Sequence, residues 1–271
     1  MSRMLGLLGG LLLGAVAAAP AMADKLDDII ESGTLRCAVT LDFPPMGFRD
    51  ESNKPAGYDV DTCNDLAKVL GVTAEIVETP FPDRIPAIVS GRADIGVAST
   101  SDTLERAKTI GFSIPYFAFK MVILTKDGVQ IDTYDQLKGH AVGSTSGTYE
   151  ALALEADVKK WNDPKGSFRP YQSQADVFLA MSQGQIDATV VTSTVAAATV
   201  KSGKFQGFKM TGDAPYTVDY VCLIGPRQEF GLINYLNLFV NHQVRSGRSQ
   251  ELNEKWVGGT LPDLTVKNVY Y

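Results

Sequence analysis

Hydroxyl side chains and an arginine follow an apolar run in the segment Arg92–Tyr116, and their spacing suits a small anion. Residues 95–98 predict a short buried strand, and hydroxyls follow it at Ser99 and Ser101. Arg106 comes shortly afterwards, and a guanidinium binds a carboxylate through two parallel hydrogen bonds. Because open α/β folds bind ligands where strands end, the segment predicts a carboxylate site. The alternative is a capped surface helix with a solvated arginine.

A polar turn from Gly143 to Thr148, with the sequence GSTSGT, suits the same kind of ligand. Ser146, Gly147 and Thr148 stand directly before a helix expected from Tyr149. Backbone N–H groups at a helix start bind carboxylates as well as phosphates. The turn lacks the lysine of a Walker motif. The alternative is an ordinary strand-to-helix turn that Ser146 caps.

Residues typical of catalytic and metal sites are few. The two histidines, His140 and His242, lie far apart in the sequence, and no CxxC, HExxH or GxSxG motif occurs. We therefore expect no metal, no cofactor and no catalytic residue.

The first 23 residues have the pattern of a secretory signal. Arg3 supplies the positive charge, residues 5–19 are apolar, and Ala21-Met22-Ala23 is a cleavage site. We expect export to the periplasm and a mature chain that starts at Asp24. The formal net charge of −6, without a basic stripe, argues against a nucleic-acid partner.

Three cysteines are present, which leaves one over if two of them pair. Cys37 falls on the first expected strand and Cys63 on the next helix, and these elements should pack together. In an oxidising compartment we therefore expect a Cys37–Cys63 disulfide and a buried Cys222 thiol. The alternative is that all three are small core residues.

Strands and helices alternate along the chain, which predicts an α/β fold with parallel sheets. Strands are expected at 35–40, 73–77 and 95–98, and a second, similar unit starts near Met121. The chain is expected to cross between the units near residues 117–120 and again near 213–218. The expected divisions are a signal peptide 1–23, a first lobe 24–118, a second lobe 119–216 and a return to the first lobe 217–271. Two connections between lobes predict a hinge, with the ligand in the cleft between them.

Seven segments together resemble the bacterial extracellular solute-binding proteins of family 3, which serve ABC importers of the polar amino acid type. The resemblance covers nearly the whole mature chain. These segments are GTLRCAV at 33–39, DFPPMGF at 42–48, GYDVD at 57–61, RIPAIVSGRADI at 84–95, TLERAKTIGFSIPY at 103–116, VGSTSGT at 142–148 and GQIDA at 184–188.

The resemblance implies a two-lobed type II periplasmic binding protein fold and a function for each matching residue. The partners implied are a small amino acid or related carboxylate and an ABC permease in the inner membrane, with the binding protein a monomer. Arg106 would hold the ligand α-carboxylate, assisted by Ser99 and Ser101. The remaining contacts would come from the turn of the second lobe and from two aromatic walls: Ser146, Gly147, Thr148, Phe43 and Phe81.

One position departs from the family pattern. An aspartate that pairs with the ligand ammonium usually stands five residues after Asp187, where this chain has Thr192. A hydroxyl cannot neutralise an ammonium in a water-poor cleft. Three hypotheses follow: Asp42 or Asp219 supplies the charge, the ligand lacks a free α-amine, or the acid lies elsewhere through a shift in the alignment.

Two other functions are compatible with the same fold. Periplasmic enzymes resembling cyclohexadienyl dehydratase eliminate water from a carboxylate-bearing substrate, although no acid stands at position 192 and no histidine is placed to help. A binding module that reports to a separate sensor is the third possibility.

Overall fold

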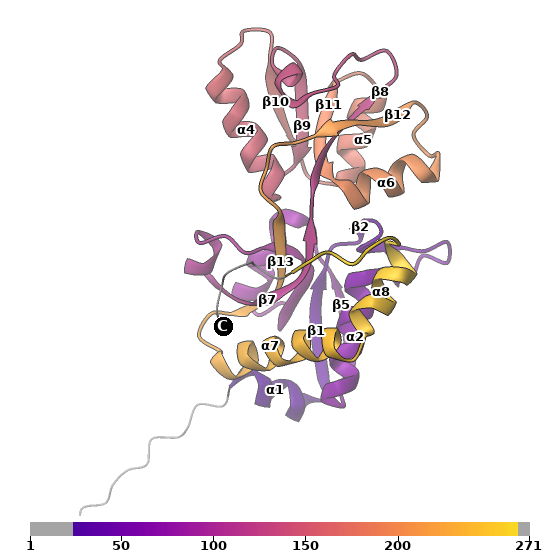
Figure 1. The fold of residues 1–271 in the computed structure, drawn as a ribbon. Helices are drawn as coiled ribbons and strands as arrows, with labels where there is room; N and C mark the ends of the chain where they lie inside the picture. The colour runs from indigo at the N-terminus through magenta and orange to yellow at the C-terminus, as the bar shows by residue number, and fades with distance from the viewer. Residues whose placement is uncertain (1–23, 265–271) are drawn as a thin grey trace, which may run out of the picture.

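Two α/β lobes form this protein, as seen in a computed structural model that describes residues 24–264 (Figure 1). The predicted signal peptide, residues 1–23, lies outside the described residues. Each lobe contains one five-stranded mixed sheet, so the α/β fold class and the two-lobed architecture are confirmed.

The first sheet has the order β5-β1-β6-β13-β7. β1 pairs in parallel with β5 and β6, whereas β13 runs antiparallel to β6 and β7. The expected parallel sheet is therefore found only in its β5-β1-β6 part, because the chain returns from the second lobe in the opposite direction. The strands are β1 (Thr34–Val39), β5 (Thr73–Glu78), β6 (Ile95–Ser101), β7 (Ile110–Phe119) and β13 (Asp219–Pro226).

The helices of the first lobe cover the faces of this sheet. Every residue of the central strand β6 is buried, as expected of a strand covered on both faces. The helices are α1 (Lys25–Ser32), α2 (Tyr58–Leu70), α3 (Arg84–Val89), α7 (Phe230–Arg245) and α8 (Arg248–Trp256), with 3-10 turns η1 (Phe81–Asp83) and η2 (Arg106–Lys108). A small antiparallel sheet is formed by β2 (Asp42–Phe43), β3 (Gly47–Arg49) and β4 (Pro55–Ala56).

The second sheet has the order β10-β9-β11-β8-β12. Its strands are β8 (Met121–Lys126), β9 (Ala141–Thr145), β10 (Ser167–Tyr171), β11 (Ala188–Thr192) and β12 (Phe208–Asp213). Its helices are α4 (Tyr149–Trp161), α5 (Gln174–Ser182) and α6 (Ser193–Ser202), with the 3-10 turn η3 (Tyr134–Leu137).

Two extended segments connect the lobes. Strand β7 leads through Lys120 directly into β8, and residues 214–218 lead from β12 into β13 (Figure 1). The exact lobe boundaries at 118/119 and 216/217 stay a prediction. Both segments lie beside the cleft, so changes in their backbone torsions can change the separation of the lobes.

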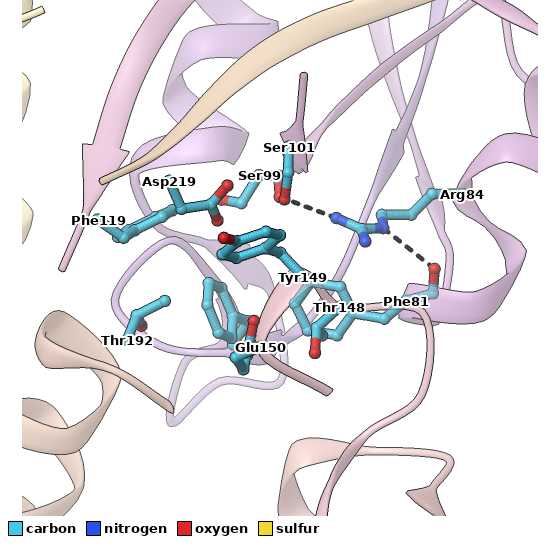
Figure 2. A pocket seen from close by; sticks show the side chains of 11 residues that line it. Phe81, Arg84, Ser99, Ser101, Phe119, Thr148, Tyr149, Glu150, Thr192 and Asp219 are labelled. Carbon is cyan, nitrogen blue, oxygen red and sulfur yellow. Dashed lines mark hydrogen bonds between the residues drawn. The ribbon is translucent and has the colours of Figure 1, made fainter. Parts of the chain in front are cut away.

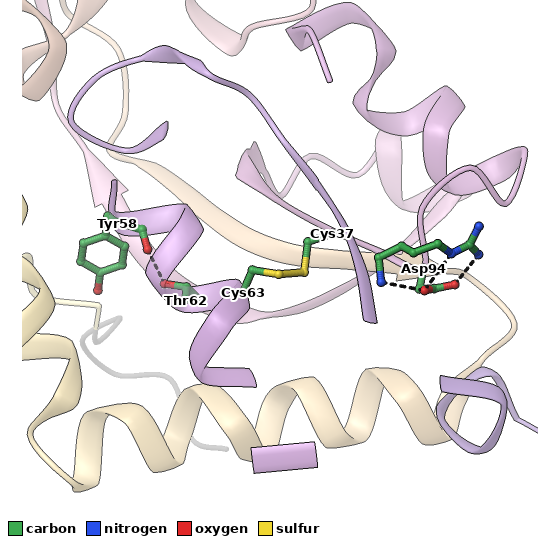
Figure 3. Close-up of a disulfide and its surroundings, with 6 residues drawn as sticks. Cys37, Tyr58, Thr62, Cys63 and Asp94 are labelled. Carbon is green, nitrogen blue, oxygen red and sulfur yellow. Dashed lines mark hydrogen bonds and ion pairs between the residues drawn. A yellow bond between two sulfur atoms is a disulfide. The ribbon is translucent and has the colours of Figure 1, made fainter. Parts of the chain in front are cut away.

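A disulfide joins β1 to α2. Cys37 and Cys63 are bonded, with their Cα atoms 6.4 Å apart (Figure 3). Cys222 is a buried free cysteine. The predicted pairing is thus confirmed. The bridge fixes α2 on strand β1 of the first sheet.

Removing this disulfide should lower the free energy of unfolding by about 3 to 4 kcal/mol, because the bridge closes a loop across a sequence separation of 26 residues. Urea unfolding of Cys37→Ala/Cys63→Ala measures the change. A reducing agent should weaken the wild-type protein equally and leave the double variant unaffected. Equal stability of the oxidised wild type and the double variant would contradict the prediction.

Candidate functional site

A pocket lies between the lobes, and aromatic side chains form part of its wall (Figure 2). The Phe43 and Phe81 rings meet edge to face, with their centroids 4.9 Å apart. The centroid of the Phe119 ring lies 6.0 Å from that of Phe43. The cavity is about 10 Å³, close to the space of one water molecule. A larger ligand therefore needs the lobes to move apart. Six predicted residues line it: Phe43, Phe81, Ser99, Ser101, Thr148 and Thr192.

Arg106 reaches from the first lobe to the second. Its Nη1 donates to the Ser101 carbonyl at 3.1 Å, and its Nη2 donates to the Gly147 carbonyl at 2.7 Å. Burial lowers the pKa of the guanidinium, whereas the negative charges of Asp219 and Glu150 oppose the shift. Arginine nevertheless remains charged at neutral pH. Two of its five N–H donors make these bonds, at the place where the first lobe meets the start of α4.

Arg84, which the sequence did not single out, lines the pocket, whereas Arg106 and Gly147 lie outside the set of lining residues. The Arg84 side chain is buried and stacks on Phe81, 4.5 Å from the ring centroid. Nε donates to the Phe81 carbonyl at 3.0 Å, Nη1 to the Ala98 and Ser99 carbonyls at 2.8 Å each, and Nη2 to Gly147 at 2.7 Å. Burial, helped by the charge of Arg106, lowers its pKa to about 9. The side chain thus holds the backbone around the pocket in place.

The Gly147 carbonyl, in the second lobe, accepts one hydrogen bond from Arg84 and one from Arg106, both in the first lobe. The residue has φ +80°, and a Cβ there would lie 3.0 Å from Pro82 Cα and 3.1 Å from the Phe81 carbonyl oxygen. Glycine is therefore the residue that fits this close approach of the lobes.

Asp42 makes another contact between the lobes. Its Oδ2 accepts from the backbone N–H of Gln174 at 2.8 Å, at the start of α5. Burial raises the pKa of Asp42, whereas this hydrogen bond opposes the shift. A carboxylate at the N-terminus of a helix, here α5, interacts favourably with the helix dipole. Asp42 is not among the residues that line the pocket.

The Ser99 hydroxyl is bonded to a buried carboxyl. It donates to Oδ2 of Asp59 at 3.0 Å, and the Tyr116 hydroxyl donates to Oδ1 at 2.6 Å. The Tyr116 oxygen also accepts from the backbone N–H of Ser99 at 3.1 Å. Ser99 has φ +47°, an uncommon conformation for a residue with a side chain. Burial raises the pKa of Asp59 to about 7.

The hydroxyls of the second lobe cap helices beside the pocket. Thr148 Oγ1 accepts from Ala151 N at 3.2 Å at the start of α4, and Thr192 Oγ1 accepts from Val195 N at 3.4 Å at the start of α6. Ser146 is outside the pocket lining, and its N–H donates to the Tyr171 carbonyl at 2.8 Å. The roles of these residues in ligand binding stay predictions.

Two acids of the pocket complete the site. Glu150, in the first turn of α4, is 3% exposed, and Asp219, at the start of β13, is 7% exposed. Burial raises the pKa of Glu150 to about 7 and that of Asp219 to about 6. Sequence reasoning named Asp219 only as one alternative and missed Glu150, whose position after the SGT turn was the available signal.

Residues 24–264 contain neither a grouping of metal ligands nor a membrane-spanning helix. In this part of the chain no three His, Cys, Asp or Glu side chains are grouped so that they could hold a metal ion. None of its helices is both long and apolar enough to cross a bilayer.

The chain belongs to the bacterial extracellular solute-binding proteins, family 3, whose family model matches residues 35–259. The match includes both sheets and the cleft between them. The recognition made from the short sequence segments is therefore confirmed.

Curated relatives include both binding proteins and an enzyme. The L-cystine-binding protein TcyJ of Escherichia coli K12 is 28% identical over 238 residues, 87% of each chain. Cyclohexadienyl dehydratase of Pseudomonas aeruginosa is 35% identical over 155 residues, 55% of this chain and 58% of that protein. Among solved structures, an ancestral arginine-binding protein bound to arginine matches with a TM-score of 0.78 and 30% identity, covering 83% of this chain and 99% of that one.

Proposed function

We propose that this protein is the extracytoplasmic binding component of an ABC importer and that it holds an amino acid or a related small carboxylate between its lobes. The observation that carries the proposal is the position of Arg106, whose guanidinium lies where the two lobes meet. A guanidinium in a buried setting is a geometric receptor for a carboxylate. Relatives of the chain include cystine-, glutamine- and arginine-binding proteins, which agrees with this ligand class.

Binding would proceed by closure of the hinge. With the lobes apart, the solute carboxylate meets Arg106 and Ser101 on the first lobe. Closure then brings the turn at Gly147 and Thr148 onto the ligand and excludes water. The ligand shifts the equilibrium only by its difference in affinity for the closed and open forms. A permease would recognise the closed shape of a periplasmic monomer.

The proposal predicts that at least one ligand in a defined panel stabilises the mature protein. The panel consists of the twenty standard L-amino acids, L-cystine and the deaminated analogue of each. A ligand at 100 times its Kd should add about 2.7 kcal/mol to the free energy of unfolding, because it binds only the folded state. Thermal-shift measurements followed by calorimetry identify the ligand. If no member of the panel binds, the proposal is wrong.

A second candidate function is a lyase of the dehydratase type, and the Glu150 side chain favours it. A pKa of about 7 leaves a large fraction of this buried carboxyl protonated at neutral pH, as a general acid requires. A protonated Glu150 would donate its proton to the substrate hydroxyl as the C–O bond breaks and water leaves, while the ring carboxylate leaves as CO2 and its bonding pair completes the aromatic ring. Arg106 would hold a second carboxylate of the substrate. Incubation with a cyclohexadienyl carboxylate that carries such a hydroxyl tests this. Product formation that Glu150→Gln abolishes would establish the lyase over the binding function.

A further inference from the structure

Two buried carboxyls from different lobes line the pocket. Asp219 opens β13 in the first lobe, and Glu150 lies in the first turn of α4 in the second (Figure 2). Both are more than nine-tenths buried. They accompany Thr192, the residue at which the family pattern places an acid, in the lining of the same pocket.

Neither carboxyl makes an ion pair, although the charges of Arg84 and Arg106 act on Asp219, and that of Arg84 on Glu150, from a greater distance. Among the described residues, no basic nitrogen lies within the 4.0 Å of a salt bridge from Asp219 or Glu150. The two nearby arginines direct donors at backbone carbonyls instead, Arg106 at Ser101 and Gly147, and Arg84 at the four carbonyls described above. The Ser101 and Thr148 hydroxyls lower the pKa of Asp219 and Glu150 respectively, but a hydroxyl supplies no positive charge.

A buried carboxylate without a directly paired cation is costly, and such groups gather at functional sites. We infer that Asp219 and Glu150 form the cation-binding end of the cleft, so that the solute carries an ammonium group as well as a carboxylate. The inference rests on the proposed function, since it concerns the same cleft. The ligand would therefore be a zwitterionic amino acid. Asp219 and Glu150 would supply the negative charge that the family pattern places at position 192, where this chain has Thr192.

The two acids also connect ligand charge to closure of the hinge. One acid belongs to each lobe, so an ammonium can contact both only when the lobes are together. Without a cation, closure brings two negative groups near each other, and the charge of Asp219 helps to raise the pKa of Glu150. The ammonium removes this repulsion, so it favours the closed form over the open one.

The affinity should change with pH in a direction that depends on the ligand. Glu150 faces Arg84, Asp219, Thr148 and Tyr216, and Asp219 faces Arg106, Arg84, Asp102 and Ser101. An ammonium lowers the pKa of both acids, so binding releases protons and the affinity rises between pH 5 and 8. A carboxylate without an amine raises these pKa values, so it takes up protons and its affinity falls over the same range.

Paired ligands test the inference. Each amino acid of the panel that binds is titrated beside its deaminated analogue, for example L-glutamine with 4-carbamoylbutanoate and L-arginine with 5-guanidinopentanoate. The amine should improve the affinity about 100-fold. Asp219→Asn and Glu150→Gln, which keep side-chain shape, should remove much of this advantage without weakening binding of the analogue, whose carboxylate the ionised acids repel. Glu51→Gln, at an exposed acid outside the pocket lining, is the matched control and should bind like the wild type.

The outcomes separate this inference from the proposed function. Equal affinity for an amino acid and its analogue, or proton uptake on amino-acid binding in calorimetry with buffers of different ionisation enthalpy, overturns the inference alone. Binding of amine-free carboxylates without binding of any amino acid also overturns it alone. If nothing in the panel binds, the proposed function fails as well.

Discussion

Replacing Arg106 with alanine should weaken solute binding about 1,000-fold, because a buried carboxylate would lose a charged donor with two parallel N–H groups. The loss should be similar for an amino acid and for its deaminated analogue, since both carry the carboxylate that Arg106 holds. Calorimetric titration of the purified variant measures the affinity. Circular dichroism should show that the fold is intact, because the side chain lies in the cleft between the lobes and makes no ion pair within the described chain.

Two further variants make this result specific. Arg106→Lys keeps the charge but loses the planar geometry, so it should recover only part of the affinity. Lys108→Ala removes an exposed cation two residues away, whose ion pair is with Glu105, and should bind like the wild type. Wild-type affinity in Arg106→Ala would show that the carboxylate is held elsewhere.

Replacing Arg84 with methionine should instead lower the free energy of unfolding by about 4 kcal/mol, because buried carbonyls would lose their donor. These carbonyls belong to Phe81, Ala98, Ser99 and Gly147. Urea denaturation of the ligand-free protein measures the loss. Arg106→Ala is the matched control and should be much less destabilised, since its guanidinium makes fewer such bonds and is less buried. A variant of Arg84 with wild-type stability would contradict the structural role given to this side chain.

The central strands of the fold were predictable from their apolar runs, and some edge strands were not. Residues 95–98 lie in β6, buried on both faces, and their continuous apolar character is typical of such a position. Strands β10 and β12 stand at the two edges of the second sheet and were not predicted. Edge strands are half exposed and less apolar, so their pattern resembles that of a loop. Strand β7 continues through Pro115 because it too lies at an edge, where a missing N–H is tolerated.

The sequence predicted which segments of the chain meet at the site, but not which side chains contact one another there. The segment that carries Arg106 and the turn that carries Gly147 do meet in the structure. Spacing did not reveal that the Ser99 hydroxyl bonds to Asp59, because that contact joins residues 40 positions apart. Nor did it reveal the burial of Arg84, since an arginine at a helix start usually faces solvent. Burial and partners depend on tertiary packing, which one sequence pattern does not specify.

The most direct test of the account is a crystal structure of the mature protein with the amino acid that the panel identifies. The account predicts the ligand between the lobes, its carboxylate within 3.2 Å of the Arg106 guanidinium nitrogens, as a hydrogen bond requires. It also predicts the ammonium between the carboxyls of Asp219 and Glu150. A ligand whose carboxylate lies away from Arg106, or one bound outside the cleft, would contradict it.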